Sequence, residues 1–170
     1  MIRKVESGEL KNVSSLFFRA IEHMIAYGIY QWDEIYPDDK TLSDDIVKHE
    51  MYGFYQGEML CGVIVLNEIQ LDPYASVEWS LDDAKPLVVH RLCIHPDFQS
   101  RGIAHALMKF AEDFAVRNRY RSIRLDAFKS NPAALHLYQR LGYQMCGTIE
   151  LRKGTFFCYE KLTTDISRGI

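Results

Sequence analysis

The chain has 170 residues, of which 48% are hydrophobic, and its formal net charge is −3 at pH 7. This length suits a single domain over residues 1–170, and the apolar content is enough for a substantial core. A general nucleic-acid binder usually carries a basic face, so the slight excess of acids argues against that class of protein.

Neither a metal site nor a membrane segment is indicated. The four cysteines, Cys61, Cys93, Cys146 and Cys158, show no CxxC spacing and no paired histidines nearby, so reduced core thiols are expected. No apolar run approaches the roughly 18 residues that span a bilayer, and no apolar signal segment follows the first methionine. We therefore expect a cytoplasmic protein without a metal, a membrane contact or a nucleic-acid partner.

The first part of the chain predicts a strand, a helix and a loop. Residues 1–6 are typical of a short strand. Apolar residues then recur at three- and four-residue spacing, which predicts an amphipathic helix with the inner face Val13, Leu16, Phe17, Ala20, Ile21 and Met24. Residues 27–39 are rich in aromatics and acids, and a loop is expected there.

A second helix and two strands follow. Ser43 is expected to cap a helix that runs to about Glu50, because Ser is a favoured N-cap residue. Residues 51–55 and 59–66 predict two strands joined around Gly57.

The middle of the chain contains the most apolar segment. Residues 72–86 are expected to be irregular, with a short strand over 76–80. Residues 87–94 are nearly all apolar and end before Pro96, which predicts a strand buried on both faces or nearly so.

Two further helices flank another strand. The first presents one apolar face, made of Ile103, Ala104, Leu107, Met108, Phe110, Ala111, Phe114 and Ala115. Residues 123–127 predict the strand, and Asn131-Pro132 is a helix-start signal. Gly142 is expected to end the second helix in a left-handed conformation, and its inward residues are Ala134, Leu137, Tyr138 and Leu141.

The chain is expected to end in a hairpin of residues 143–150 and 155–162 around Gly154. Because strands and helices alternate before this hairpin, the sequence predicts an α/β fold in which helices cover a mixed sheet.

The stretch over residues 90–104 has the most chemical content. A buried strand leads through a short loop into the start of a helix, where unpaired N–H groups and a partial positive charge can hold an anion. Gly102 has no Cβ and lets a phosphate approach the backbone, and Arg101 adds positive charge. The GxxxxGK[ST] and GxGxxG phosphate motifs are both absent.

This stretch resembles motif A of the Gcn5-related N-acetyltransferases (GNAT), Gln/Arg-x-x-Gly-x-Gly/Ala, through Gln99, Gly102 and Ala104. Residues 131–143, with Asn131, Ala134, Tyr138 and Gly142-Tyr143, resemble motif B of the same family, and residues 159–162 are similar to its last strand. About two thirds of the chain matches in order.

The resemblance implies the GNAT fold, a twisted mixed sheet splayed in the middle, and acetyl-coenzyme A (acetyl-CoA) as co-substrate. Backbone groups of Leu92 and Ile94 would pair with the pantetheine arm, as an added strand does. Asn131 would contact this arm. The pyrophosphate would be held by backbone N–H groups of Gln99, Ser100, Arg101, Gly102, Ile103 and Ala104.

The implied chemistry is attack of an amine on a thioester. Tyr138 would lie near the sulfur and protonate the leaving thiolate, and an N–H near Cys93 or Ile94 would stabilise the oxyanion. His90 or Glu78, the latter through water, would take the proton of the amine.

Each assignment has a plain structural alternative. Tyr138 at helical spacing also fits a core aromatic, His90 a satisfied core histidine and Glu78 a solvated acid. Water and backbone alone could also serve in place of a dedicated base.

Two charged stretches have open roles. Residues 27–50 contain four aromatics (Tyr27, Tyr30, Trp32 and Tyr36) and seven acids (Asp33, Glu34, Asp38, Asp39, Asp44, Asp45 and Glu50). They fit either an entry for a cationic amine or a solvated acidic face over a small core. Basic residues Arg117, Arg119, Arg121 and Arg124 fit a site for the 3′-phosphate of coenzyme A or, more simply, a soluble helix end.

Three functions remain open. The first is acetylation of a small-molecule amine, which the absence of a basic or low-complexity docking tail favours. The second is acetylation of a protein N-terminus or lysine, and the third is a non-catalytic acyl-CoA-binding sensor. A homodimer is expected from the resemblance alone.

Overall fold

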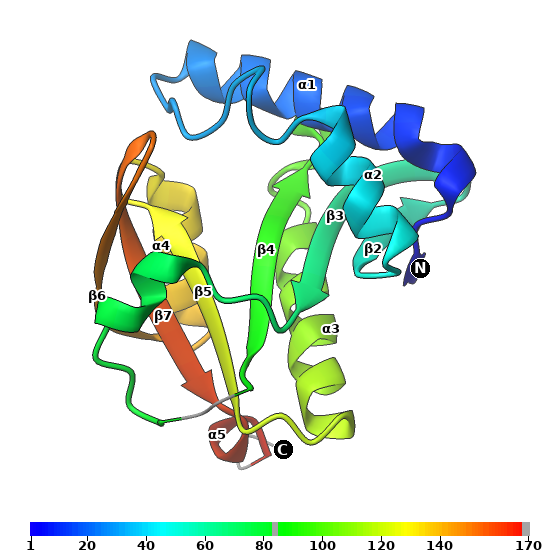
Figure 1. Ribbon diagram of the computed structural model, residues 1–170. Coiled ribbons are helices and arrows are strands. Elements are labelled where there is room, and N and C mark those ends of the chain that lie inside the picture. Colours follow the sequence, from blue (N-terminus) through cyan, green and yellow to red (C-terminus); the bar gives the residue numbers. More distant parts are fainter. Residues whose placement is uncertain (83–84, 168–170) are drawn as a thin grey trace. The chain divides into compact units, whose positions relative to one another are not determined.

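A computed structural model describes residues 1–82 and 85–167, and its strands form one mixed sheet in the order β1-β2-β3-β4-β5-β7-β6, flanked by helices (Figure 1). The strands are β1 (Ile2–Lys4), β2 (Met51–Gln56), β3 (Met59–Asn67), β4 (Leu87–Ile94), β5 (Ser122–Phe128), β6 (Gln144–Leu151) and β7 (Gly154–Leu162). The helices are α1 (Leu10–Ala26), α2 (Asp39–Val47), α3 (Ile103–Arg117), α4 (Pro132–Arg140) and α5 (Thr163–Ser167), with 3-10 turns η1 (Ser7–Glu9), η2 (Asp72–Ser76) and η3 (Pro96–Phe98). The predicted α/β class is confirmed.

The chain divides into two compact units. Unit 1 is Met1–Leu66 with Arg91–Met108, and unit 2 is Asn67–His90 with Lys109–Ile170. Strand β4 and helix α3 therefore each contribute residues to both units. The single domain over residues 1–170 stays a prediction.

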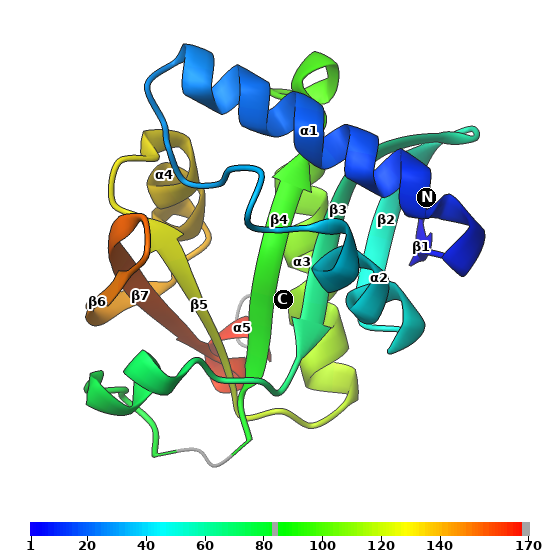
Figure 2. The same cartoon turned by 45° about the horizontal axis from the view of Figure 1, so that its top comes forward.

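Unit 1 has a core between α1, α2 and the first strands. Figure 2 shows α1 and α2 on one face of β2 and β3. The predicted inner face of α1 is confirmed, since Val13, Leu16, Phe17 and Ala20 are buried and Ile21 and Met24 pack against the same core. Glycine is needed in β3, because a Cβ on Gly62 would lie 2.7 Å from Ile94 Cδ1 and 3.1 Å from the Cys93 carbonyl oxygen.

The start of α2 differs from the prediction. Asp38, not Ser43, is the N-cap: its carboxylate accepts hydrogen bonds from the backbone N–H and the hydroxyl of Thr41, at 2.9 and 2.6 Å. Ser43 lies within the helix, which ends at Val47. Asp and Ser are equally good caps, so residue type could not separate the two positions.

Unit 2 contains the C-terminal hairpin beside β5. Strand β7 is antiparallel to β5 from Ser122↔Leu162 to Phe128↔Phe156, and to β6 on its other side. Gly154 begins β7 with φ +125°, as expected for the predicted turn. At the amino ends of β4 and β5 the parallel ladder joins Leu87 to Ile123 and Val88 to Arg124.

The predicted strand over residues 76–80 is wrong. The 3-10 turn η2 occupies Asp72–Ser76, and the indole N–H of Trp79 then donates to the Tyr74 carbonyl at 3.0 Å, which folds the segment back on itself. Residues 83–84 of the expected irregular stretch lie outside the described residues. Over residues 1–82 and 85–167, no helix is long and apolar enough to cross a bilayer.

Candidate functional site

In unit 1, a loop with left-handed backbone joins β4 and η3 to α3. Ser100 and Gly102 have φ of +59° and +77°, on either side of the exposed Arg101. Alternating backbone conformations of this kind turn successive N–H groups toward one concavity that binds anions. A Cβ on Gly102 would meet no atom within 4 Å, so the space in front of the loop is open.

The first N–H groups of α3 add to this concavity. A helix leaves its first four N–H groups without an intrahelical acceptor. Helix α3 is 15 residues long and presents such groups at its start, from Ile103 on. The N–H of Gln99 instead donates to the Pro96 carbonyl at 3.2 Å, so the cradle extends from Ser100 to Ala104. The Arg101 guanidinium lies 5.1 Å from the centre of the Phe98 ring, which places a cation beside the loop. These groups fit a pyrophosphate.

Strand β4 contains a break in its extended backbone just before the residues expected to pair with pantetheine. Arg91 has φ +48°, whereas an extended strand has a negative φ. Cys93 is buried, which raises the pKa of its thiol, and Leu92 and Ile94 are half-buried. Because of this break, the regular alternation of a strand does not place His90 on the same face as Leu92 and Ile94.

Unit 2 contains Tyr138 on the inner face of α4. Its side chain is 5% exposed, and its ring packs against those of Tyr143 and Tyr159 with centroids 6.0 and 5.9 Å away. Burial, and next the negative charge of Asp126, raise the pKa of the Tyr138 phenol. The group is therefore a protonated hydroxyl at neutral pH, as a proton donor must be.

Asn131 is the N-cap of α4, as predicted. Its Oδ1 accepts from the N–H of Ala134 at 3.2 Å, and Pro132 takes the first helical position. The expected contact of Asn131 with the pantetheine arm stays a prediction.

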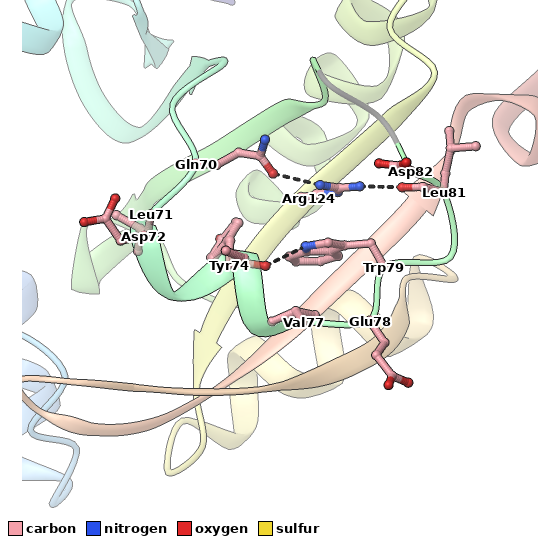
Figure 3. Close-up of a pocket in the computed structure, with 11 residues that line it drawn as sticks. Gln70, Leu71, Asp72, Tyr74, Val77, Glu78, Trp79, Leu81, Asp82 and Arg124 are labelled. Atoms are coloured by element: carbon pink, nitrogen blue, oxygen red, sulfur yellow. Dashed lines mark hydrogen bonds between the residues drawn. The ribbon is translucent and has the colours of Figure 1, made fainter.

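The two candidate bases have different surroundings in unit 2. His90 Nε2 lies 3.0 Å from the carbonyl oxygen of Ile69. A carbonyl only accepts, so Nε2 carries the proton and the lone pair of the neutral ring is on Nδ1. Glu78 is exposed, and Figure 3 shows its carboxylate pointing away from the Trp79 and Tyr74 rings.

Asp126 on β5 was not among the predicted site residues. This half-buried carboxylate accepts a hydrogen bond from the Tyr74 hydroxyl at 2.7 Å, and its charge adds to the effect of burial in raising the pKa of Tyr138. Asp126 stands twelve residues before Tyr138 in the chain, and only the fold brings a carboxylate close to the candidate acid. The sequence does show that Asp126 lies near the end of the predicted strand over residues 123–127, shortly before motif B, and this position could have marked it as a candidate.

A hollow of about 760 Å³ opens in unit 2 between residues 70–82 and β5 (Figure 3). The Arg124 guanidinium lies at its edge and donates to Gln70 Oε1 at 2.7 Å, to the Leu81 carbonyl at 2.6 Å and to Glu160 Oε1 at 3.0 Å. All three guanidinium nitrogens bind protein, so Arg124 is a structural residue and not a phosphate ligand. In the part of the chain that the structure describes, no group of His, Cys, Asp and Glu side chains could hold a metal ion.

The aromatic and acidic stretch over residues 27–50 in unit 1 is mostly engaged in the fold. Trp32 is a core residue, Asp33 Oδ1 accepts from two N–H groups of its own loop, and Asp45 pairs with the half-buried Arg91. Tyr27 and Tyr30 are 72% and 56% exposed. The exposed Tyr27 and Tyr30 fit an entry for a cationic amine, whereas most of the acids are already bound to other groups of the protein.

Comparison with known proteins identifies related sequences. The model of the acetyltransferase (GNAT) family matches residues 14–143. Streptothricin acetyltransferase of Streptomyces lavendulae is 30% identical over 74 residues, which cover 44% of this chain and 39% of that protein. The chain thus matches less than half the length of this curated relative.

Solved structures share the fold over nearly the whole chain. A GNAT-family acetyltransferase from Streptococcus agalactiae has a TM-score of 0.84 at 23% identity, covering 95% of this chain and 94% of its own. PaiA N-acetyltransferase of Thermoplasma acidophilum, in complex with coenzyme A, has 0.72 at 18% identity over 95% and 98%. The ribosomal-protein-S18-alanine N-acetyltransferase of Escherichia coli has 0.70 at 16% identity over 96% and 93%. At these identities the likeness establishes the fold.

Proposed function

Because the chain belongs to the acetyltransferase (GNAT) family, we propose that it transfers the acetyl group of acetyl-CoA to a primary amine, in a ternary complex of both substrates. The observation that carries this proposal is the cradle from Ser100 to Ala104, whose two left-handed residues and following helix start fit a pyrophosphate. The backbone of Leu92 to Ile94, directly upstream, would pair with the pantetheine arm, and Asn131 would contact it.

The reaction needs a base, an oxyanion donor and an acid, while acetyl-CoA supplies the thioester that the amine attacks. An amine with a pKa of about 10.4 must lose a proton first, and His90, Glu78 and Asp126 are the groups that could take it. An N–H at Cys93 or Ile94 would face the developing oxyanion. The Tyr138 hydroxyl would return a proton to the departing sulfur.

We propose a small-molecule amine as the acceptor. Streptothricin acetyltransferase is named for a small molecule and the Escherichia coli neighbour for an alanine of a ribosomal protein, so both classes occur among similar proteins. The identity is 30% over 74 residues to the protein named for a small molecule and 16% to the protein named for a ribosomal protein, which favours the small amine. The alternatives are a protein N-terminal or lysine acetyltransferase and, from another class, a non-catalytic acyl-CoA sensor.

The test is coenzyme A release from acetyl-CoA with a panel of amines, polyamines, amino acids and N-terminal peptides. Tyr138→Phe is run beside the wild type, with Tyr143→Phe as a matched control. Both changes remove one hydroxyl from a buried tyrosine, and Tyr143 Oη has no hydrogen-bond partner in the described structure. We expect kcat to fall about a hundredfold in Tyr138→Phe and to stay within about twofold in Tyr143→Phe.

The outcomes separate the hypotheses. Turnover with one acceptor class names the substrate class. Tight binding of acetyl-CoA without turnover on any acceptor would favour the sensor, and no binding at all would refute the proposal.

A further inference from the structure

Arg91 has an unusual backbone for a residue with a side chain. Its φ of +48° lies in the left-handed region, which favours glycine, and it lies within β4 immediately before Leu92. A non-glycine residue keeps such a conformation only where its surroundings hold it there.

The Arg91 side chain is held by a buried carboxylate in unit 1. Its Nε donates to Asp45 Oδ2 at 2.7 Å and its Nη2 to Asp45 Oδ1 at 2.6 Å, and the two side chains are only 11% and 7% exposed. This two-point contact fixes the direction of the guanidinium as well as its distance. Asp45 is itself fixed, because it lies on α2 between the core residues Leu42 and Ile46.

The remaining guanidinium nitrogen binds the loop before α2. Arg91 Nη1 donates to the Tyr36 hydroxyl at 2.6 Å, and the guanidinium lies 5.9 Å from the centre of that ring. Three chain segments of unit 1 thus converge on one side chain: β4, helix α2 and the loop of residues 27–38. Each contact restricts Arg91, and therefore the backbone on both sides of it.

We propose that Asp45 and Arg91 are positioning residues, which hold β4 in the left-handed conformation and so set the direction of the backbone groups of Leu92, Cys93 and Ile94. The inference rests on the proposed function, in which those groups pair with pantetheine and face the oxyanion. Neither side chain takes part in the chemistry. Their effect is exerted through the backbone.

The test compares Ala and Gly at position 91 in an Asp45→Asn background, which avoids leaving a buried charge unpaired. Both double variants lose the ion pair between positions 45 and 91. Glycine accepts a positive φ without it, whereas alanine favours the extended backbone of a regular strand. Coenzyme A affinity is measured by calorimetry, and folding by circular dichroism.

We expect Asp45→Asn/Arg91→Gly to bind coenzyme A about five to ten times more tightly than Asp45→Asn/Arg91→Ala when both are folded. Equal affinities would overturn the inference, since the ion pair would then contribute only to stability. If neither double variant folds, Arg91→Lys decides, because it keeps the charge but not the two-point contact. A folded Arg91→Lys with about fivefold weaker binding supports the inference, and wild-type affinity overturns it. If the wild type fails to bind coenzyme A, the proposed function fails, and the inference with it.

Discussion

The Tyr74 hydroxyl donates a 2.7 Å hydrogen bond to the Asp126 carboxylate, across 52 residues of sequence. Tyr74 is 2% exposed and belongs to η2, whereas Asp126 is half-buried on β5. The bond restrains the Asp126 carboxylate. Burial, and next the negative charge of Asp126, raise the pKa of both Tyr74 and Tyr138. Because its charge acts on the candidate acid Tyr138, Asp126 is a candidate base for the same reaction.

The first prediction concerns the identity of the base. We expect Asp126→Asn to lower kcat at least about tenfold at pH 7 if this carboxylate takes the proton of the amine, while Glu78→Gln and His90→Gln change it little. Tyr74→Phe is the comparison variant, because it keeps the Asp126 carboxylate and removes only the hydrogen bond that restrains it, so kcat should fall less than in Asp126→Asn. The main effect of Tyr74→Phe should be a loss of about 2 kcal/mol in stability. A larger loss of kcat in either Glu78→Gln or His90→Gln would transfer the role to that residue.

The second prediction is the pH dependence of the Tyr138 effect. Its folded-state pKa is raised above the ordinary value of about 10, so the phenol stays protonated throughout the neutral and mildly alkaline range. The ratio of wild-type to Tyr138→Phe kcat should therefore be constant from about pH 7 to about 9.5. A ratio that falls toward one above about pH 8.5 would mean that the phenol ionises there and would contradict the assignment.

The third prediction concerns Arg124 and Glu160, which are 3% and 1% exposed and joined at 3.0 Å. Removing one partner leaves a buried charge, so Arg124→Leu should cost about 3 to 5 kcal/mol in stability, and Arg124→Leu/Glu160→Leu should recover part of it. Urea unfolding measures both. The matched control is Arg121→Ala, three residues earlier and exposed, which should change stability by less than about 0.5 kcal/mol. Equal losses at positions 121 and 124 would refute the structural role of Arg124.

Local patterns in the sequence predicted the elements with strong periodicity. Strand β4 was placed at Leu87–Ile94, α1 and α3 by their apolar faces, and α4 by the Asn131-Pro132 start signal. These features depend on neighbouring residues, which short-range spacing reports directly.

Features that depend on distant residues could not be found in this way. The left-handed Arg91 is paired with Asp45, 46 positions away in the chain, and the pKa of Tyr138 depends on its burial and on the charge of Asp126. No periodicity indicates such pairings. The resemblance to motifs A and B identified the family, but it could not show which side chains hold the motif residues in place.

The last prediction concerns Glu9, whose contribution to the stability of the protein should be lost in acid. Glu9 accepts hydrogen bonds from the Arg3 guanidinium at 2.8 and 3.0 Å and from the Tyr55 hydroxyl at 2.9 Å. The Arg3 hydrogen bond is the main cause that lowers the pKa of Glu9 to about 2, below its usual value of about 4.3. A depressed folded-state pKa stabilises the protein above the unfolded value, and this contribution is lost as the pH falls from about 5 to about 2.

Because the pair is partly exposed to solvent, Glu9→Gln should cost only about 1 kcal/mol at pH 7. The difference from wild type in urea unfolding should shrink toward zero near pH 2. Asp44→Asn is the matched control, since its i,i+4 partner Lys40 has an 81% exposed side chain, and little change is expected at any pH. If the Glu9→Gln difference were the same at pH 7 and at pH 2, the carboxylate charge would not be the source of the stabilisation, and the ion pair with Arg3 would have no part in holding η1 against β1.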